Sequence, residues 1–456
     1  MKRAFLLFIT LLMLFSMTAC TIPGLEDPTE PPTEAPTNPP SRPKPTVVSK
    51  VTDPLTWEDI DAIPIANSSM TEDELRQIIV QFMELQNSFT WQPTSTLEYY
   101  SQTKYMCLTS NIVYGGCPYI SGKMGSLYNI MHFYDEKTGL LDVEKLTSSK
   151  QNWEEIIANV CSSSPYWALS RVSNSVKYAW SSSTVQAYGC IPIAPFVMDP
   201  TIINFDKNHD NVVTYDICMS QENGEQTVFE AYAQLLPGDG LTYYYAPDSH
   251  GHVIMCSSKA VVVRNQDGTI DPKKSYITYL DQTLSCDSAS HFYPQDPDNG
   301  EKVHTYGSVH RKATFDWLLN HTIGGQKQGY IPWRIPELYT DANGNKMAEV
   351  EKAELNVSFS GTSATLMQLR RMTIESNYPI SYVQCVVKDP NGNELFREYV
   401  YAMSLNKYEM AGVEGAVIDT AAMGALANGE NIAEISVRVS TGELLTAFSG
   451  KFMPAK

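Results

Sequence analysis

Cys161 is the first residue whose type and neighbours suggest chemistry. It is followed by Ser162, Ser163, Ser164 and Pro165, and then by an apolar run. Because proline is tolerated only in the first turn of a helix, Pro165 predicts that a helix begins close to Cys161. The positive end of a helix favours a thiolate, and its amide groups can stabilise an oxyanion. The pattern indicates a nucleophile, although a cysteine at a helix start, taken alone, is more often structural.

His252 is the candidate general base. It follows Gly251 and begins an apolar run that predicts a strand over residues 253–263, and a further strand is expected over residues 276–280. If these strands are antiparallel neighbours, the end of the second lies beside His252. A histidine there can take a proton from a thiol and deliver it to a leaving amine.

Asp281 and Gln282 end the second of these strands. An acidic or amide side chain at this place can hold the imidazole in its productive tautomer. The two residues point to opposite faces of a strand, so only one of them can do so. We favour Asp281, because a carboxylate also stabilises the imidazolium.

Metal and cofactor sites are not expected. His250 and His252 form a His-x-His pair, but the sequence offers no third ligand, and no CxxC pair occurs among the nine cysteines. Residues 206–211 resemble the start of a calcium loop, yet its twelfth position is Ile217 where a glutamate belongs. We interpret that stretch as a polar turn.

The elements that must position these residues mix helices with strands. Helical spacing of apolar residues predicts helices over residues 71–85, 162–180 and 227–236, and strands are expected over residues 241–245, 253–263 and 276–280. Beyond residue 345 the pattern is that of strands only, as in Leu355, Val357 and Phe359 and again in Ile435, Val437 and Val439. The fold class is therefore α+β, followed by a small all-β, sandwich-like domain.

These motifs together resemble the NlpC-type and CHAP-type papain-like hydrolases. The resemblance lies in the helix-opening Cys161, the run Pro237-Gly238-Asp239, the run Gly251-His252-Val253 and the polar end of the next strand. It implies a papain-like domain of a helix and an antiparallel sheet, with Cys161 as nucleophile, His252 as base and Asp281 or Gln282 as the orienting residue. Gly116-Cys117-Pro118-Tyr119 is similar to the family's Gly-x-Pro-Tyr segment, which implies that Tyr119 lines the substrate cleft.

Two features depart from this family. Val160 stands where these enzymes commonly carry aspartate, and an insert at about residues 187–231 separates Cys161 from His252. The same order of cysteine, histidine and aspartate also occurs in transglutaminase-like enzymes, which stay an alternative.

The N-terminal segment is expected to be a targeting signal. Lys2 and Arg3 precede a short apolar run, and Met17-Thr18-Ala19-Cys20 resembles the lipobox of bacterial lipoproteins. That resemblance implies cleavage before Cys20 and a diacylglycerol on its sulfur, which anchors the chain to the outer face of the cell membrane. A secretory signal cut near Ala19 is the alternative. Residues 21–50 contain nine prolines and predict an extended tether.

The charge composition of the chain limits the classes of partner that it can bind. The 456 residues include 33 basic and 51 acidic side chains, a formal charge of −18, which argues against nucleic acid.

We expect a signal peptide at 1–19, a lipidated tether at 20–50, a papain-like domain with an N-terminal helical extension at 51–344 and a β domain at 345–456. The expected function is a membrane-anchored cysteine amidase or endopeptidase that acts on peptidoglycan peptides. The alternative is a non-catalytic lipoprotein that binds the wall or a partner; the oligomeric state is not predicted.

Overall fold

The structure is a computed structural model. It describes residues 50–100, 105–108, 110, 112–119, 125–146, 159–176, 190–198, 213–245, 250–283, 304–323, 325–340, 345–401, 407–409 and 430–453. The expected signal peptide, Cys20 and nearly all of the tether lie outside the described residues, as does the polar stretch at 206–211. Among the described residues, none of the helices has the length and apolar composition needed to cross a bilayer.

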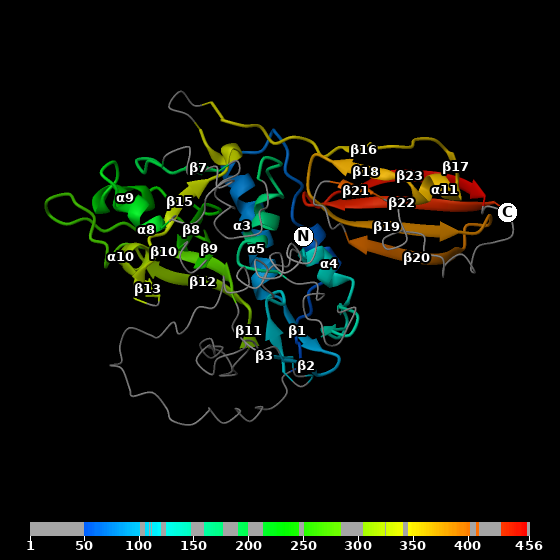
Figure 1. Cartoon of the computed structure of the whole chain (residues 1–456), viewed down its shortest axis with the longest axis horizontal. Coiled ribbons are helices and arrows are strands. Elements are labelled where there is room, and N and C mark those ends of the chain that lie inside the picture. Colours follow the sequence, from blue (N-terminus) through cyan, green and yellow to red (C-terminus); the bar gives the residue numbers. More distant parts are fainter. Residues whose placement is uncertain are drawn as a thin grey trace, which may run out of the picture. The chain divides into compact units, whose positions relative to one another are not determined.

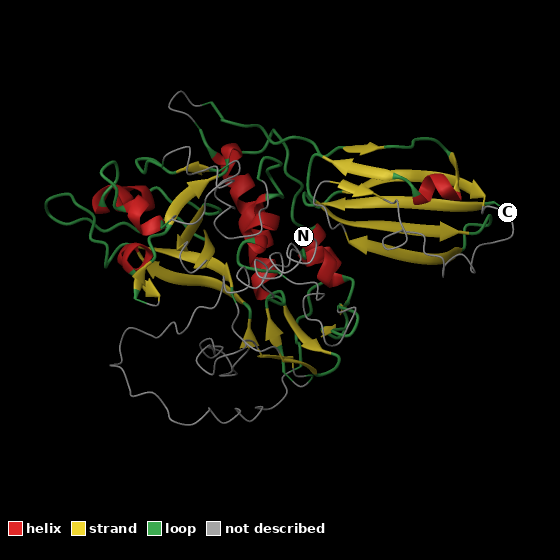
Figure 2. Ribbon diagram, in the orientation of Figure 1, coloured by secondary structure: helices red, strands yellow, loops and turns green. Residues whose placement is uncertain are grey.

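The chain is a mixed α+β protein that is rich in antiparallel sheet and divides into two compact units (Figures 1 and 2). The first takes in most of the chain up to Ala348. The second consists of Glu349–Lys456 together with two short segments, Pro64–Thr71 and Ser170–Asn174. Both short segments lie outside the range predicted for the β domain, residues 345–456.

The main sheet of the first unit has six antiparallel strands in the order β12-β10-β9-β8-β15-β7. Their bounds are β7 Ile191–Pro192, β8 Gly240–Tyr245, β9 His250–Cys256, β10 Tyr276–Gln282, β12 Gly307–Thr314 and β15 Ile331–Arg334.

Shorter strands complete the first unit. A five-stranded sheet has the order β11-β4-β1-β6-β5, and there are two hairpins, β2-β3 and β13-β14. Their bounds are β1 Thr90–Pro93, β2 Leu97–Tyr100, β3 Tyr105–Leu108, β4 Tyr114–Gly115, β5 Tyr134–Asp135, β6 Leu140–Leu141, β11 His304–Thr305, β13 Thr322–Ile323 and β14 Gln326–Lys327.

Helices pack against both faces of the main sheet (Figure 1). The helices of the first unit are α2 (Trp57–Asp61), α3 (Glu72–Ser88), α4 (Leu127–Met131), α5 (Ser163–Leu169), α8 (Thr214–Cys218), α9 (Glu225–Tyr232) and α10 (Phe315–Asn320), with the 3-10 turn η4 (Pro336–Leu338). Helices α3 and α5 pack against each other, and α5 also packs against β9. On the other face, α8, α9 and α10 bury a core that includes Phe229, Phe315, Leu318 and Ile331.

Helix α3 confirms the first predicted helix. Its apolar residues Leu75, Ile78, Ile79 and Phe82 recur at helical spacing and are buried.

Three other predicted elements need correction. The helix expected over residues 162–180 ends at Leu169, and the apolar Val172 and Val176 are buried outside it. Residues 170–174 are held in the second unit instead, where Ser170 O accepts a hydrogen bond from Ser440 Oγ at 2.7 Å. The helix expected over residues 227–236 is α9, which begins and ends earlier.

The strand expected over residues 253–263 is β9, which ends at Cys256. Beyond that point Val261 only forms an isolated bridge with Tyr276. The apolar run there comes from a loop that packs back on the sheet, which a pattern of apolar residues cannot distinguish from a longer strand.

The second unit contains two sheets around one apolar core. The three-stranded sheet is β16 (Leu355–Val357), β18 (Thr373–Ser376) and β21 (Lys407–Glu409), and the five-stranded sheet is β17 (Ser363–Thr365), β23 (Leu444–Met453), β22 (Asn431–Val439), β19 (Ile380–Lys388) and β20 (Glu394–Tyr401). The short helix α11 (Leu366–Arg370) corrects the expectation of strands only, and Figure 2 shows it beside the strands of this unit.

Candidate functional site

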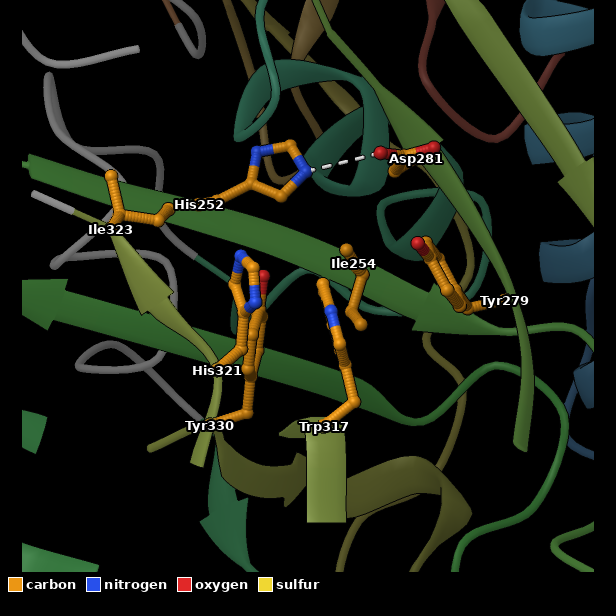
Figure 3. A pocket seen from close by; sticks show the side chains of 8 residues that line it. All are labelled: His252, Ile254, Tyr279, Asp281, Trp317, His321, Ile323 and Tyr330. Atoms are coloured by element: carbon orange, nitrogen blue, oxygen red, sulfur yellow. Dashed lines mark hydrogen bonds and ion pairs between the residues drawn. The ribbon is translucent and has the colours of Figure 1, made fainter. Parts of the chain in front are cut away.

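His252 and Asp281 form a buried pair on neighbouring strands of the main sheet. Asp281 on β10 is paired with Ile254 on β9, two residues beyond His252, so both side chains project from the same face. His252 Nε2 lies 3.2 Å from Asp281 Oδ2, and the two residues are 3% and 2% exposed. The carboxylate therefore holds the imidazole with its proton on Nε2, and Figure 3 shows Nδ1 pointing away from Asp281.

A β-bulge lies next to Asp281. On β10 the pairing advances from Tyr279 to Asp281, whereas on edge strand β12 it advances from Arg311 to Ser308, so β12 carries one extra residue there. His310 within the bulge has a φ of 56°, and its Nε2 lies 3.2 Å from Glu84 Oε1 on α3. The bulge changes the register of β12 beside Asp281, which pairs with Ser308.

Cys161 lies in the turn that leads into α5 and is 1% exposed. The Val160 N–H donates to Ser163 Oγ at 2.7 Å, and the N–H groups of Ser163 and Ser164 donate back to Val160 O, each at 3.1 Å. These hydrogen bonds fix the backbone turn that contains Cys161. The side chain of Val160 is buried, and its backbone N–H and C=O groups both form hydrogen bonds of the turn.

A polar chain from α3 supports this turn. Gln86 Nε2 donates to Ser164 O at 3.0 Å, and Asn159 Nδ2 donates to Gln86 Oε1 at 3.1 Å. Gln86 and Asn159 are fully buried. Because a buried amide that loses its partners is costly, Gln86 fixes the path of the chain on either side of Cys161.

Gln282 and Tyr119 lie with the Cys117 segment and not with His252. Gln282 projects from the face of β10 opposite to Asp281, and its Nε2 donates to Cys117 O at 2.5 Å. Tyr119 is 1% exposed, forms a parallel bridge with Asn159 and is absent from the lining of the pocket beside His252. Of the two residues proposed to orient the imidazole, Asp281 is the one in contact with it.

A pocket borders the His252–Asp281 pair (Figure 3). Its other lining residues are Ile254, Tyr279, Trp317, His321, Ile323 and Tyr330. Sequence reasoning missed the last four, which follow the predicted strands. The available signal was the spacing of Trp317 and His321, which lie four residues apart at the end of a short helix and stack at 4.8 Å.

Burial and several neighbouring groups perturb the Tyr330 hydroxyl, which belongs to the lining of this pocket. Burial raises the pKa of Tyr330 well above its ordinary value, and the nearby ionisable groups of Tyr243, Tyr279, Asp281 and Cys161 raise it further. The hydroxyl therefore stays protonated. Among these groups, Asp281 lines the pocket, whereas Cys161 precedes α5, which packs against β9.

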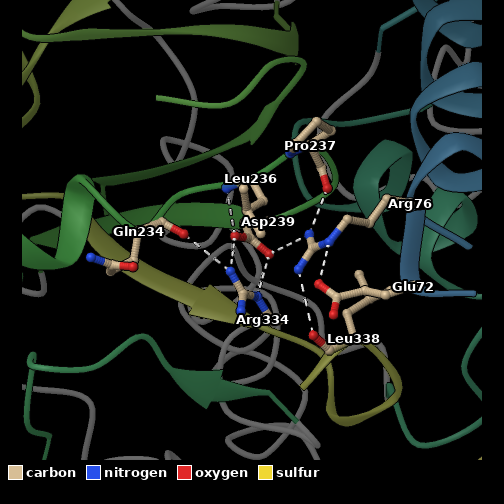
Figure 4. Close-up of polar contacts among 8 residues, drawn as sticks. All are labelled: Glu72, Arg76, Gln234, Leu236, Pro237, Asp239, Arg334 and Leu338. Atoms are coloured by element: carbon tan, nitrogen blue, oxygen red, sulfur yellow. Dashed lines mark hydrogen bonds and ion pairs between the residues drawn. The ribbon is translucent and has the colours of Figure 1, made fainter. Parts of the chain in front are cut away.

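The Pro237-Gly238-Asp239 motif has an architectural role (Figure 4). Asp239 is fully buried and accepts two hydrogen bonds from Arg334, at 2.8 and 2.7 Å, and one from Arg76 on α3 at 2.9 Å. Arg76 Nη1 also donates to Pro237 O at 2.6 Å. This ion-pair cluster joins α3, the start of β8 and the end of β15.

The thiols and histidines of the described residues form no metal site. No group of three or more His, Cys, Asp or Glu side chains is arranged to hold a metal ion in the part of the chain that the structure describes. The cysteines recorded there as free thiols are Cys117, Cys161, Cys190, Cys218, Cys256 and Cys385, all of them buried. The side chain of His250 lies outside the described set.

Comparison with known proteins adds little to this geometry. No protein-family model matches the chain, and no curated protein matches it. Among solved structures, the chain is similar to the crystal structure of CopC from Methylosinus trichosporium OB3b, at 12% identity and a TM-score of 0.14, with 23% of this chain and 97% of that chain covered. A TM-score of that size does not indicate a shared fold, so the function must be argued from the site.

Proposed function

We propose that the chain is a membrane-anchored cysteine amidase or endopeptidase that hydrolyses peptide amide bonds of the bacterial cell wall. The observation that carries the proposal is the buried His252–Asp281 pair on β9 and β10, with Cys161 in the turn that leads into α5, the helix that packs against β9. A papain-like arrangement, with the nucleophile in front of a helix and the base on a strand, accounts for these positions. The lipid anchor and proline-rich tether proposed for residues 20–50 suit a wall substrate.

The proposed reaction has two steps. Cys161 Sγ attacks the amide carbon while its proton passes to His252 Nδ1. The C–N bond then breaks, His252 protonates the leaving amine, and a thioester remains on Cys161. Water attacks the thioester with His252 as base, which releases the acid and restores the thiol. Asp281 orients the ring and stabilises the imidazolium in both steps.

The direct test is digestion of purified peptidoglycan by the chain and by its Cys161→Ala variant. We expect new amino groups to appear only with the wild-type chain, as measured by amine-reactive labelling of the products. A matched Cys218→Ala variant, which alters another fully buried thiol, should retain the activity. Equal release by the wild-type and Cys161→Ala chains would refute the proposal.

A second candidate function is a non-catalytic protein that binds the wall or a partner. It is favoured by the depth of the site, since Cys161, His252 and Asp281 are each 3% exposed or less. Alkylation with iodoacetamide, read by peptide mapping, separates the two functions. An activated Cys161 reacts well below pH 8, whereas Cys117, Cys190 and Cys218 should stay unlabelled because burial raises their pKa.

A further inference from the structure

Gln282 is the start of a series of buried hydrogen bonds that leads from β10 to α3. Its side chain is fully buried, and its Nε2 donates to Cys117 O at 2.5 Å. The N–H group of Cys117 donates to Gln86 O on α3 at 2.8 Å. The backbone of the Cys117 segment is therefore bonded to β10 through its carbonyl group and to α3 through its N–H group.

This segment and Gln86 hold the chain on both sides of Cys161. On the N-terminal side, the Asn159 N–H group donates to Pro118 O at 2.9 Å. On the C-terminal side, Ser164 O accepts from Gln86 Nε2 at 3.0 Å, and Gln86 Oε1 accepts in turn from Asn159 Nδ2 at 3.1 Å. Hydrogen bonds therefore connect β10 to the turn that carries the thiol.

Stability alone does not explain a glutamine at position 282. Gln282 Oε1 is buried and has no hydrogen-bond partner among the residues that the structure describes. Burying an amide with an unpaired oxygen is costly, and an apolar side chain of the same size would avoid that cost. What the glutamine adds is a bond from β10 to the Cys117 segment, one residue after the carboxylate that contacts His252.

We propose that Gln282 is a positioning residue for Cys161, which holds the nucleophile turn in place relative to β10. Asp281 on one face of this strand contacts His252, and Gln282 on the opposite face is bonded through the Cys117 segment to the turn. One strand thus positions both the base and the nucleophile. The role of Cys161 as nucleophile rests on the proposed function, but the coupling can be measured without turnover.

The test compares hydrogen–deuterium exchange of the full-length wild-type and Gln282→Met chains by mass spectrometry. Methionine keeps the size of the side chain but cannot donate to Cys117 O. We expect the amides of residues 159–164 to exchange roughly tenfold faster or more in the variant, while α9, on the other face of the main sheet, keeps its rate. The pH profile of Cys161 alkylation by iodoacetamide should move to higher pH, because a displaced thiol gains less from the imidazole.

The matched control is Gln328→Met. Gln328 is buried in the same unit, its Nε2 donates to Gln326 O at 2.8 Å, and its Oε1 also lacks a partner within the described part of the chain. Both substitutions should therefore lower the free energy of unfolding in urea by similar amounts, whereas only Gln282→Met should speed exchange in residues 159–164.

A second variant, Gln86→Met, removes the next link of the same network. It should also speed exchange over residues 159–164. Adding Gln282→Met to it should change these rates little further, because two residues that act through one network are not additive.

Unchanged exchange in residues 159–164, or faster exchange throughout the first unit, would overturn the inference, because Gln282 would then have no role or only a structural one. Equal effects of Gln282→Met and Gln328→Met on these residues, or an unchanged pH profile of alkylation, would also overturn it. The proposed function fails separately, when the wild-type chain and Cys161→Ala release equal amounts of product from peptidoglycan. Selective loosening of the turn without hydrolysis would keep the coupling and reject the enzyme.

Discussion

At the scale of single residues, the two ring nitrogens of His252 have different roles. Asp281 engages Nε2 at 3.2 Å, which leaves Nδ1 as the nitrogen able to accept a proton. Gln282, one residue later, donates a hydrogen bond to Cys117 O on the other face of the strand. Adjacent residues of β10 thus have separate roles, because side chains alternate between the faces of a sheet.

Replacing Asp281 by Asn tests this orientation. The amide keeps the shape but can present a donor to Nε2, which favours the wrong tautomer. We expect peptidoglycan hydrolysis to fall by roughly a hundredfold to ten-thousandfold, with little loss of folded protein. Asp142→Asn, at a surface ion pair with Lys145, is the control and should leave the rate unchanged. A fall of less than threefold in Asp281→Asn would show that the carboxylate does not orient the base.

His321 predicts a pH dependence of stability. Burial lowers its pKa below the ordinary value near 6.5, so the unfolded chain binds this proton at a higher pH than the folded chain does. The free energy of unfolding should therefore decrease as the pH falls from about 7 towards the lowered pKa. In His321→Gln, urea unfolding at about pH 7.5 and pH 5.5 should reveal a smaller decrease than in the wild type. An unchanged decrease would contradict the assignment.

The ion-pair cluster around Asp239 is the main feature at the scale of elements. It joins α3 to the beginning of β8 and the end of β15. The beginning of β8 pairs with the end of β9, away from His252. If Asp239 loses its charge, Arg334 loses the carboxylate that it contacts, whereas Arg76 keeps its ion pair with Glu72 at 2.7 Å.

Asp239→Asn should destabilise the first unit by roughly 3–5 kcal/mol. The measurement is urea unfolding followed by tryptophan fluorescence, which reports on this part of the chain because all seven tryptophans precede residue 334. Asp142→Asn, which breaks an ion pair nearer the surface, should cost about 1 kcal/mol or less. Similar losses in both variants would show that the buried cluster contributes no more than a surface pair.

The bulge on β12 gives a second prediction about elements. His310 adopts a positive φ that glycine accepts freely and a β-branched residue strongly resists. We expect His310→Val to be less stable than His310→Gly by about 1–2 kcal/mol in the same unfolding assay. Because the bulge lies beside Asp281, the valine variant should also hydrolyse peptidoglycan more slowly. Equal stability of the two variants would mean that the bulge relaxes without cost.

At the scale of the whole molecule, the proposed function depends on delivery to the wall. A lipid on Cys20 followed by a stretch rich in proline would hold the folded units at the membrane and extend them outwards. Such a tether would keep the enzyme close to the wall, which is an immobile substrate outside the membrane.

Cys20→Ser tests the anchor. The serine variant should be absent from the membrane fraction of the cells and should appear in the aqueous phase of a Triton X-114 partition, whereas the wild type enters the detergent phase. Peptidoglycan hydrolysis by the purified variant should be unchanged, since the site lies in the first unit. Retention of the variant in the detergent phase would exclude lipidation at Cys20 as the anchor.

Local patterns in the sequence were sufficient to find several of the elements. Helical spacing predicted α3, Pro165 located the start of α5, and strand-like runs predicted β8 and β10. These features depend on neighbours within a few residues, which hydrogen bonds of helices and turns also connect, so the sequence expresses them directly.

Only the tertiary structure decided which of these residues meet. The pairing of His252 with Asp281, the aromatic pocket formed by Trp317 and Tyr330, and the clamp of Arg76 on Asp239 all join positions from separate elements. Strand order and register determine such contacts, and they follow from the packing of the whole core rather than from any local pattern. The premature end of the helix at Leu169 has the same cause, because the following residues find their partners far along the chain in the second unit.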